Sequence, residues 1–130
     1  REIQSVFQCG SCSDEETLRT IRDVYDTFGY LVDTHTAVAF SVLETLRRES
    51  GQRRKTVVVS TASPYKFCDS VLTALGGDTG ASGLDLIDRL EEKTGTKAPY
   101  PLKSLRGKPV RFTQAVKKED MPDAVRRFLG

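Results

Sequence analysis

Two adjacent hydroxyl residues, Ser60 and Thr61, directly follow a row of β-branched residues at 56–59. The run Thr-Val-Val-Val has no polar alternation, which is typical of an inner strand covered on both faces. Ligands of open α/β sheets bind outside the carboxyl ends of the strands, so the pair is expected to offer hydrogen bonds to a ligand. The spacing of these residues also allows an alternative, in which both hydroxyls only cap the helix expected to begin at Pro64.

Three further groups of residues have side chains that could form a site. Cys9 and Cys12 form a single C-x-x-C, but zinc would need a second ligand pair and a redox pair a thioredoxin-like context, so no metal site is predicted. His35, the sole histidine, begins a helix, where capping or packing is favoured over catalysis. The glycine-rich stretch 76–83 follows a helix rather than a strand, which favours a helix stop over a phosphate loop.

The composition indicates one globular domain. The chain has 130 residues, 38% of them hydrophobic and 29% charged, and a net charge of +2. This charge favours neither nucleic acid nor a membrane as a partner, and no apolar run approaches the length of a membrane span. A cytoplasmic protein is therefore expected.

Capping residues, apolar spacing and glycine stops predict alternating helices and strands. The predicted helices span residues 14–28, 35–50, 64–75, 84–93 and 121–129. The predicted strands span 30–32, 56–59 and 110–113, the last at a sheet edge. Such alternation predicts an α/β fold of parallel-sheet βαβ layers over residues 1–80. Residues 81–130 are expected to form an extension containing a helix, a loop, an edge strand and a closing helix.

The segments GYLVDTHTAVAF (29–40) and VVVSTASPYKF (57–67) closely resemble the C-terminal part of threonine synthase, and SDEETLRTI (13–21) is similar to the region just upstream. The resemblance covers roughly residues 1–76. It implies a pyridoxal-phosphate (PLP) enzyme of fold-type II, with this chain as part of its large domain. Such an enzyme converts O-phosphohomoserine and water to L-threonine and phosphate. Ser63 departs from the family pattern, because many members have His at this position.

The resemblance also implies roles for single residues. Thr61, and with it Ser60, would contact the cofactor, Thr61 at the pyridine nitrogen. Lys66 and Ser63 would line the substrate pocket. Three residues of the 29–40 segment would support the neighbouring strand end or contact substrate: Asp33, His35 and Thr36.

The family holds its cofactor as a Schiff base on a Lys in its N-terminal half, and these 130 residues contain no such segment. The chain also opens Arg-Glu-Ile and has its sole Met at 121. We therefore expect a C-terminal fragment with no catalytic residue of its own, inactive and without bound PLP, whose partner is the N-terminal half of the same enzyme. Two alternatives stay open: a stand-alone small α/β module that binds an anion or other ligand, and a thiol-redox protein built on Cys9 and Cys12.

Overall fold

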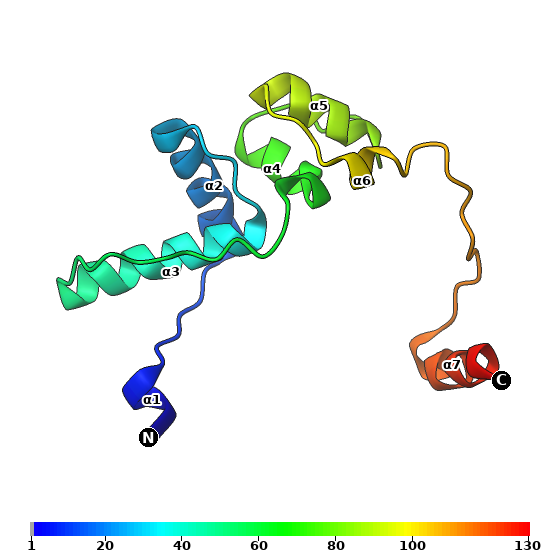
Figure 1. Ribbon diagram of the computed structural model, residues 1–130, viewed down its shortest axis with the longest axis horizontal. Helices are drawn as coiled ribbons and strands as arrows, with labels where there is room; N and C mark the ends of the chain where they lie inside the picture. The colour runs from blue at the N-terminus through cyan, green and yellow to red at the C-terminus, as the bar shows by residue number, and fades with distance from the viewer. Residues whose placement is uncertain (1) are drawn as a thin grey trace.

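The computed structural model describes residues 2–130, and these residues form helices joined by turns and extended segments (Figure 1). The α-helices are α1 (Glu2–Val6), α2 (Asp14–Phe28), α3 (Thr34–Ser50), α4 (Cys68–Ala74), α5 (Asp85–Thr94), α6 (Tyr100–Lys103) and α7 (Met121–Leu129). The 3-10 turns are η1 (Pro64–Lys66) and η2 (Lys118–Asp120).

The prediction of a parallel-sheet α/β fold is wrong, because no strand occurs within residues 2–130. The segments 30–32, 56–59 and 110–113 lack regular structure, and Val57 and Val59 are 89% and 70% exposed. A strand forms only where a neighbour pairs with its backbone, and β-branched residues supply a propensity but not that neighbour. The edge strand expected in the C-terminal extension fails for the same reason, since Val110 and Phe112 lie on an exposed arm.

The capping and glycine-stop signals at the ends of α2 are confirmed, whereas the single helix predicted over 64–75 is divided at Phe67 into η1 and α4. The Ser13 hydroxyl accepts a hydrogen bond from the backbone N–H of Glu16 at 3.2 Å, and the Glu16 carboxylate accepts one from the Ser13 N–H at 2.9 Å, which completes the predicted capping box. The backbone N–H of Ser13 lowers the pKa of Glu16, as does the Ser13 hydroxyl. Gly29 ends α2 with φ 63°, a left-handed conformation that suits glycine.

The core lies between α2, α3, α4 and α5. Helix α2 packs against α3 and α4, and α4 packs against α5 (Figure 1). The largest fully buried side chains come from α2, α4, α5 and the loop before α3: Ile21, Leu72, Leu90, Val32, Val71 and Asp33. Val32 is therefore buried, although it belongs to a loop and not to the predicted strand 30–32.

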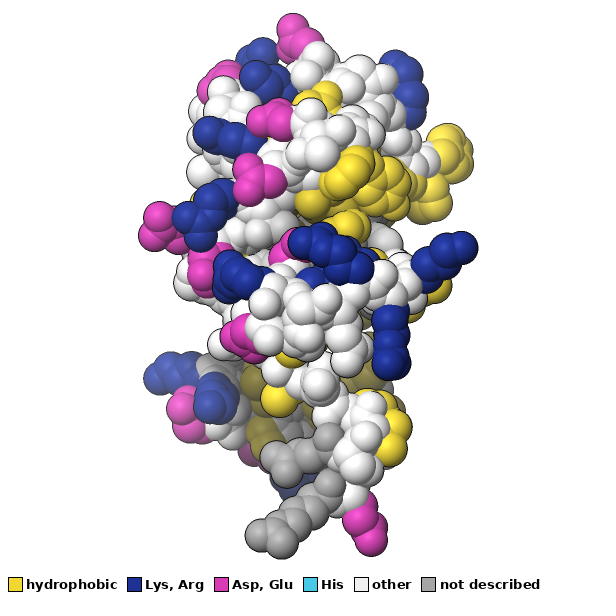
Figure 2. All heavy atoms as spheres, turned by 90° about the vertical axis from the view of Figure 1, so that its left-hand side faces the viewer, with side chains coloured by type: hydrophobic (Ala, Val, Ile, Leu, Met, Phe, Trp, Pro, Cys, Tyr) yellow, Lys and Arg dark blue, Asp and Glu magenta, His cyan; other side chains and the backbone are white. Residues whose placement is uncertain are grey.

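Much of the molecule lies outside this core. The segment after α3 runs back alongside that helix, where Arg47 Nη2 donates to the carbonyl of Arg54 at 3.4 Å (Figure 1). Helices α1 and α7 lie at the two ends of the chain, away from the core helices (Figure 1). Figure 2 shows hydrophobic side chains gathered at the surface next to lysines and arginines. Within the part described by the structure, no helix has the length and apolar character needed to cross a bilayer.

Candidate functional site

A buried carboxylate organises the start of α3. Asp33 is the N-cap of this helix and is completely inaccessible to solvent. Its Oδ1 accepts hydrogen bonds from the backbone N–H of His35 at 2.9 Å and of Thr36 at 3.4 Å. Its Oδ2 accepts a hydrogen bond from the Thr36 hydroxyl. Both oxygens are therefore satisfied, which a buried carboxylate requires.

The Asp33 carboxyl stays ionised in this position. Burial alone would raise its pKa, but the hydrogen bonds donated by the Thr36 hydroxyl and by the backbone of His35 and Thr36 outweigh burial and hold the pKa below its ordinary value. A fixed negative charge therefore lies beneath the first turn of α3.

The hydroxyl of Thr36 connects this carboxylate to Ser60, which lies in the segment 57–67. Thr36 Oγ1 and Ser60 Oγ are hydrogen-bonded at 3.1 Å across 24 positions of sequence. The Ser60 hydroxyl also lies 3.4 Å from the carbonyl oxygen of Ala62. Asp33, Thr36 and Ser60 thus form one polar network that joins the start of α3 to the segment at 60–62.

The imidazole of His35 lies at the edge of this network. Its Nδ1 is 3.1 Å from Asp33 Oδ1, and its ring packs at a tilt against the Phe67 ring, with centroids 4.9 Å apart. The side chain is 61% exposed. This contact was not predictable from the sequence, since nothing in the spacing places residue 67 against residue 35.

Three other predicted site residues stay apart from the network. Thr61 is exposed, and its hydroxyl forms no hydrogen bond within the described chain. The Ser63 hydroxyl accepts a hydrogen bond from the backbone N–H of Tyr65 at 3.3 Å and so caps η1. Lys66 is exposed at the end of η1.

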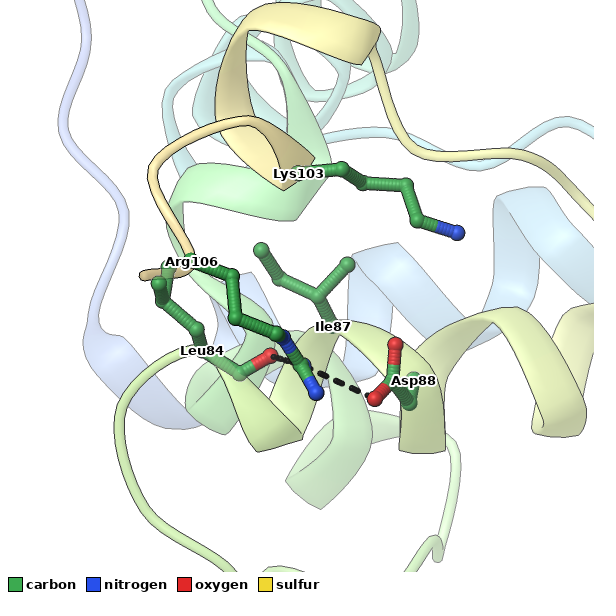
Figure 3. A pocket seen from close by; sticks show the side chains of 5 residues that line it. All are labelled: Leu84, Ile87, Asp88, Lys103 and Arg106. Atoms are coloured by element: carbon green, nitrogen blue, oxygen red, sulfur yellow. Dashed lines mark hydrogen bonds and ion pairs between the residues drawn. The ribbon is translucent and has the colours of Figure 1, made fainter. Parts of the chain in front are cut away.

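A hollow of about 230 Å³ between α5 and α6 is a second candidate (Figure 3). Its two cations are already neutralised: Arg106 pairs with Asp88 at 2.8 Å, and Lys103 pairs with Glu91 at 2.8 Å. The hydrogen bond from Lys103 lowers the pKa of Glu91. An anionic ligand would have to break these pairs, so the network at Asp33 is the better candidate site.

The three cysteines are free thiols in different surroundings. Cys9 is exposed, and Cys12 Sγ lies 3.4 Å from the Thr17 hydroxyl. Burial raises the pKa of the Cys68 thiol to about 11, so this thiol stays protonated. No group of three metal-ligating side chains gathers among residues 2–130.

Comparisons with known proteins converge on one family. The family described as "Threonine synthase, C-terminal" matches residues 36–129. Threonine synthase of Pseudomonas aeruginosa is 33% identical over 119 residues, which cover 84% of this chain and 25% of that protein. Threonine synthase of Saccharomyces cerevisiae is 37% identical over 76 residues, and threonine synthase-like 1 of Mus musculus is 35% identical over 90. These matches cover 55% and 66% of this chain but only 15% and 12% of those proteins, so the chain spans a quarter or less of each relative.

Proposed function

The chain belongs to the threonine synthase family, whose C-terminal region it matches, and from this premise we propose that it is the C-terminal portion of a PLP-dependent enzyme. That enzyme would convert O-phosphohomoserine and water to L-threonine and phosphate. The portion described here would supply one wall of the active site. The remainder of the same enzyme would be its partner and would supply the cofactor-anchoring Lys.

The observation that carries this proposal is the network of Asp33, Thr36 and Ser60. It ties the segment at 60–62 to the start of α3 through a carboxylate that is completely buried. Thr61 comes directly after the tethered Ser60 and has its side chain exposed. A free hydroxyl on a fixed segment is suited to meeting a ligand, because little further ordering is needed on binding.

The residues present fit PLP as one wall of its site. Thr61 would offer its unengaged hydroxyl to the pyridine nitrogen, and Ser60 would line the same wall. When bound, PLP supplies an electron sink for the reacting amino acid, and a hydroxyl at the ring nitrogen moderates that sink because it does not force protonation. Lys66, exposed and cationic, would face the phosphate group of the substrate. Ser63 would lie along the same pocket as a fixed cap.

A chimeric enzyme tests the proposal. The matching C-terminal region of the Pseudomonas aeruginosa threonine synthase is replaced by this chain, and phosphate release from O-phosphohomoserine is measured with PLP present. We expect turnover by the chimera and none by the 130-residue chain alone. Turnover by the isolated chain would contradict the proposal, because the chain would then be an enzyme without its partner. A folded chimera that does not bind PLP would also contradict it and would favour a stand-alone binding module.

Substitutions at Thr61 sharpen this test. Thr61→Val keeps the shape of the side chain but removes the hydroxyl, which leaves a polar ring atom without its partner. Such a loss costs about 1–3 kcal/mol, or roughly 5- to 150-fold in cofactor affinity or rate. Thr61→Ser retains the hydroxyl and is the matched control, expected to keep much of the activity. Equal activity in both variants would show that the Thr61 hydroxyl has no role at the cofactor.

A further inference from the structure

The protonation state of the His35 ring follows from its contact with Asp33. The carboxylate is ionised and can only accept a hydrogen bond, and Nδ1 lies 3.1 Å from its Oδ1. Nδ1 also lies 3.4 Å from the Thr34 hydroxyl, a longer contact in which the hydroxyl oxygen can accept. The closer contact with the carboxylate requires the proton to be on Nδ1. In the neutral ring the lone pair is then on Nε2, the other nitrogen.

Both partners of this contact are held in place. Asp33 is fixed by the backbone N–H groups of His35 and Thr36 and by the Thr36 hydroxyl. The His35 ring is fixed on a second side by the Phe67 ring, at 4.9 Å between centroids. A ring held by a hydrogen bond and an aromatic contact has lost most of its rotational freedom, so Nε2 has a defined direction.

We propose that Asp33 and His35 form a proton-accepting dyad, in which Asp33 positions the ring and His35 Nε2 is the reactive atom. The His35 side chain is 61% exposed, whereas Asp33 is completely buried, so a partner reaches the histidine and not the acid. The partner is a small group with an O–H or N–H to donate, such as water, a hydroxyl or an amine. Its proton moves to Nε2, the imidazolium charge is offset by Asp33, and the proton then returns to solvent.

The dyad is a separate feature from the hydroxyls of Ser60 and Thr61 in the proposed function. It rests on that function only for the identity of the proton donor, which would be the substrate or the water consumed with it. Asp33 is the charged group in direct contact with the ring. Lys66 and Asp69, on either side of Phe67 in sequence, are exposed. A purely structural reading, in which Asp33 only caps α3, requires no preference for either tautomer of His35.

The single histidine allows a direct test by nuclear magnetic resonance. In the 15N-labelled 130-residue chain at about pH 9, well above the usual imidazole range, long-range 1H–15N spectra report which ring nitrogen carries the proton. We expect the Nδ1–H tautomer to predominate, against the Nε2–H preference of free histidine. A majority of the Nε2–H tautomer would overturn the dyad.

Two variants separate the dyad from simple capping. Asp33→Asn keeps a good N-cap but replaces the charged acceptor with a neutral amide, so the Nδ1–H population should fall markedly. Thr36→Val removes a hydrogen bond to the other carboxylate oxygen and should leave the tautomer unchanged. If the tautomer is unchanged in Asp33→Asn, or if the Nδ1–H population falls equally in both variants, then Asp33 is not the group that sets the tautomer of His35.

The role of Nε2 is tested in the chimeric enzyme. His35→Gln should lower kcat by about 100-fold, within the range of general acid–base catalysis, while the KM for O-phosphohomoserine changes little. An unchanged rate per folded molecule would overturn the proton-accepting role. Inactivity of the chimera itself would count against the proposed function. The tautomer experiment tests the contact between Asp33 and His35 without any turnover, so the two failures can be told apart.

Discussion

The hydroxyl of Thr36 is the residue-scale feature on which the candidate site depends, because it donates to the buried Asp33 carboxylate and also meets Ser60. Thr36→Val keeps the shape of the side chain and removes both contacts. The carboxylate stays buried with one donor fewer, so we expect the free energy of unfolding to fall by about 1–3 kcal/mol. Urea denaturation followed by circular dichroism measures this change.

Thr73→Val is the matched control for this substitution. Its hydroxyl donates only to the carbonyl of Asp69 in its own helix, and the residue is exposed. We expect a change within about 0.5 kcal/mol, as is usual for surface substitutions. Equal losses in the two variants would mean that the Thr36 hydroxyl contributes no more than a surface threonine.

The Asp33 carboxylate should also make stability depend on pH. Its pKa in the folded chain lies below the ordinary value of 3.8, so the native state binds fewer protons than the unfolded state as pH falls through this range. The stabilisation is fully present above about pH 5 and is lost as the pH drops through the folded-state pKa. The stability difference between the wild type and Asp33→Asn should therefore shrink between about pH 5 and pH 2. A difference that stays constant over this range would show that the charge contributes nothing.

Individual residues were predictable where the signal was local. Serine and aspartate are common N-cap residues, and Asp33 and Ser63 each accept a hydrogen bond from a backbone N–H two residues further along the chain. The contact between Thr36 and Ser60 was not predictable as a hydrogen bond, because it spans 24 positions and depends on how the chain returns along α3. The resemblance implied a cofactor contact for Ser60 and a supporting or substrate contact for Thr36; the structure shows that their hydroxyls meet, and those roles stay predictions.

At the scale of elements, the phenol of Tyr65 connects η1 to the loop after α5. The buried Tyr65 has its hydroxyl 2.6 Å from that of Thr96, which in turn lies 2.8 Å from the Thr94 hydroxyl. Tyr65→Phe removes this connection and leaves the Thr96 hydroxyl with one partner fewer. We expect a loss of about 0.5–1.5 kcal/mol in the free energy of unfolding, measured by urea denaturation.

Tyr30→Phe serves as the comparison, since Tyr30 is 55% exposed and its hydroxyl forms no hydrogen bond with the residues that the structure describes. This variant should be nearly neutral. If Tyr65→Phe proves equally neutral, then η1 is held by the apolar packing of the ring alone and not by its hydroxyl.

The elements also show where sequence patterns mislead. Helices α2 and α3 begin and end close to the predicted residues, because capping and glycine stops are properties of a few adjacent residues. The stretch at 56–59 has the composition of a buried strand, yet Val57 is 89% exposed. Strand formation depends on a partner that lies elsewhere in the chain or beyond it, and composition does not reveal whether that partner is present.

For the molecule as a whole, burial is concentrated in the first three-quarters of the sequence. Ala98 is the last buried residue, and everything described after it is half-buried or exposed. Within the C-terminal arm, residues 107–130, α7 packs mainly against η2, and the centroids of the Phe112 and Phe128 rings are 6.2 Å apart. Residues of the arm therefore contact mainly one another and make few contacts with the core helices.

Truncation tests this division of the molecule. Deleting residues 107–130 removes no buried side chain, so we expect the free energy of unfolding to change by less than about 0.5 kcal/mol. Limited proteolysis should also cut first within 107–117, the extended part of the arm.

Deleting residues 96–130 is the control, because it also removes the partners of Tyr65 and Glu91, namely Thr96, the Ala98 N–H and Lys103. With three hydrogen bonds lost at about 0.5–1.5 kcal/mol each, this shorter chain should be clearly less stable. Equal destabilisation by the two deletions would show that α7 and its arm pack on the core in solution.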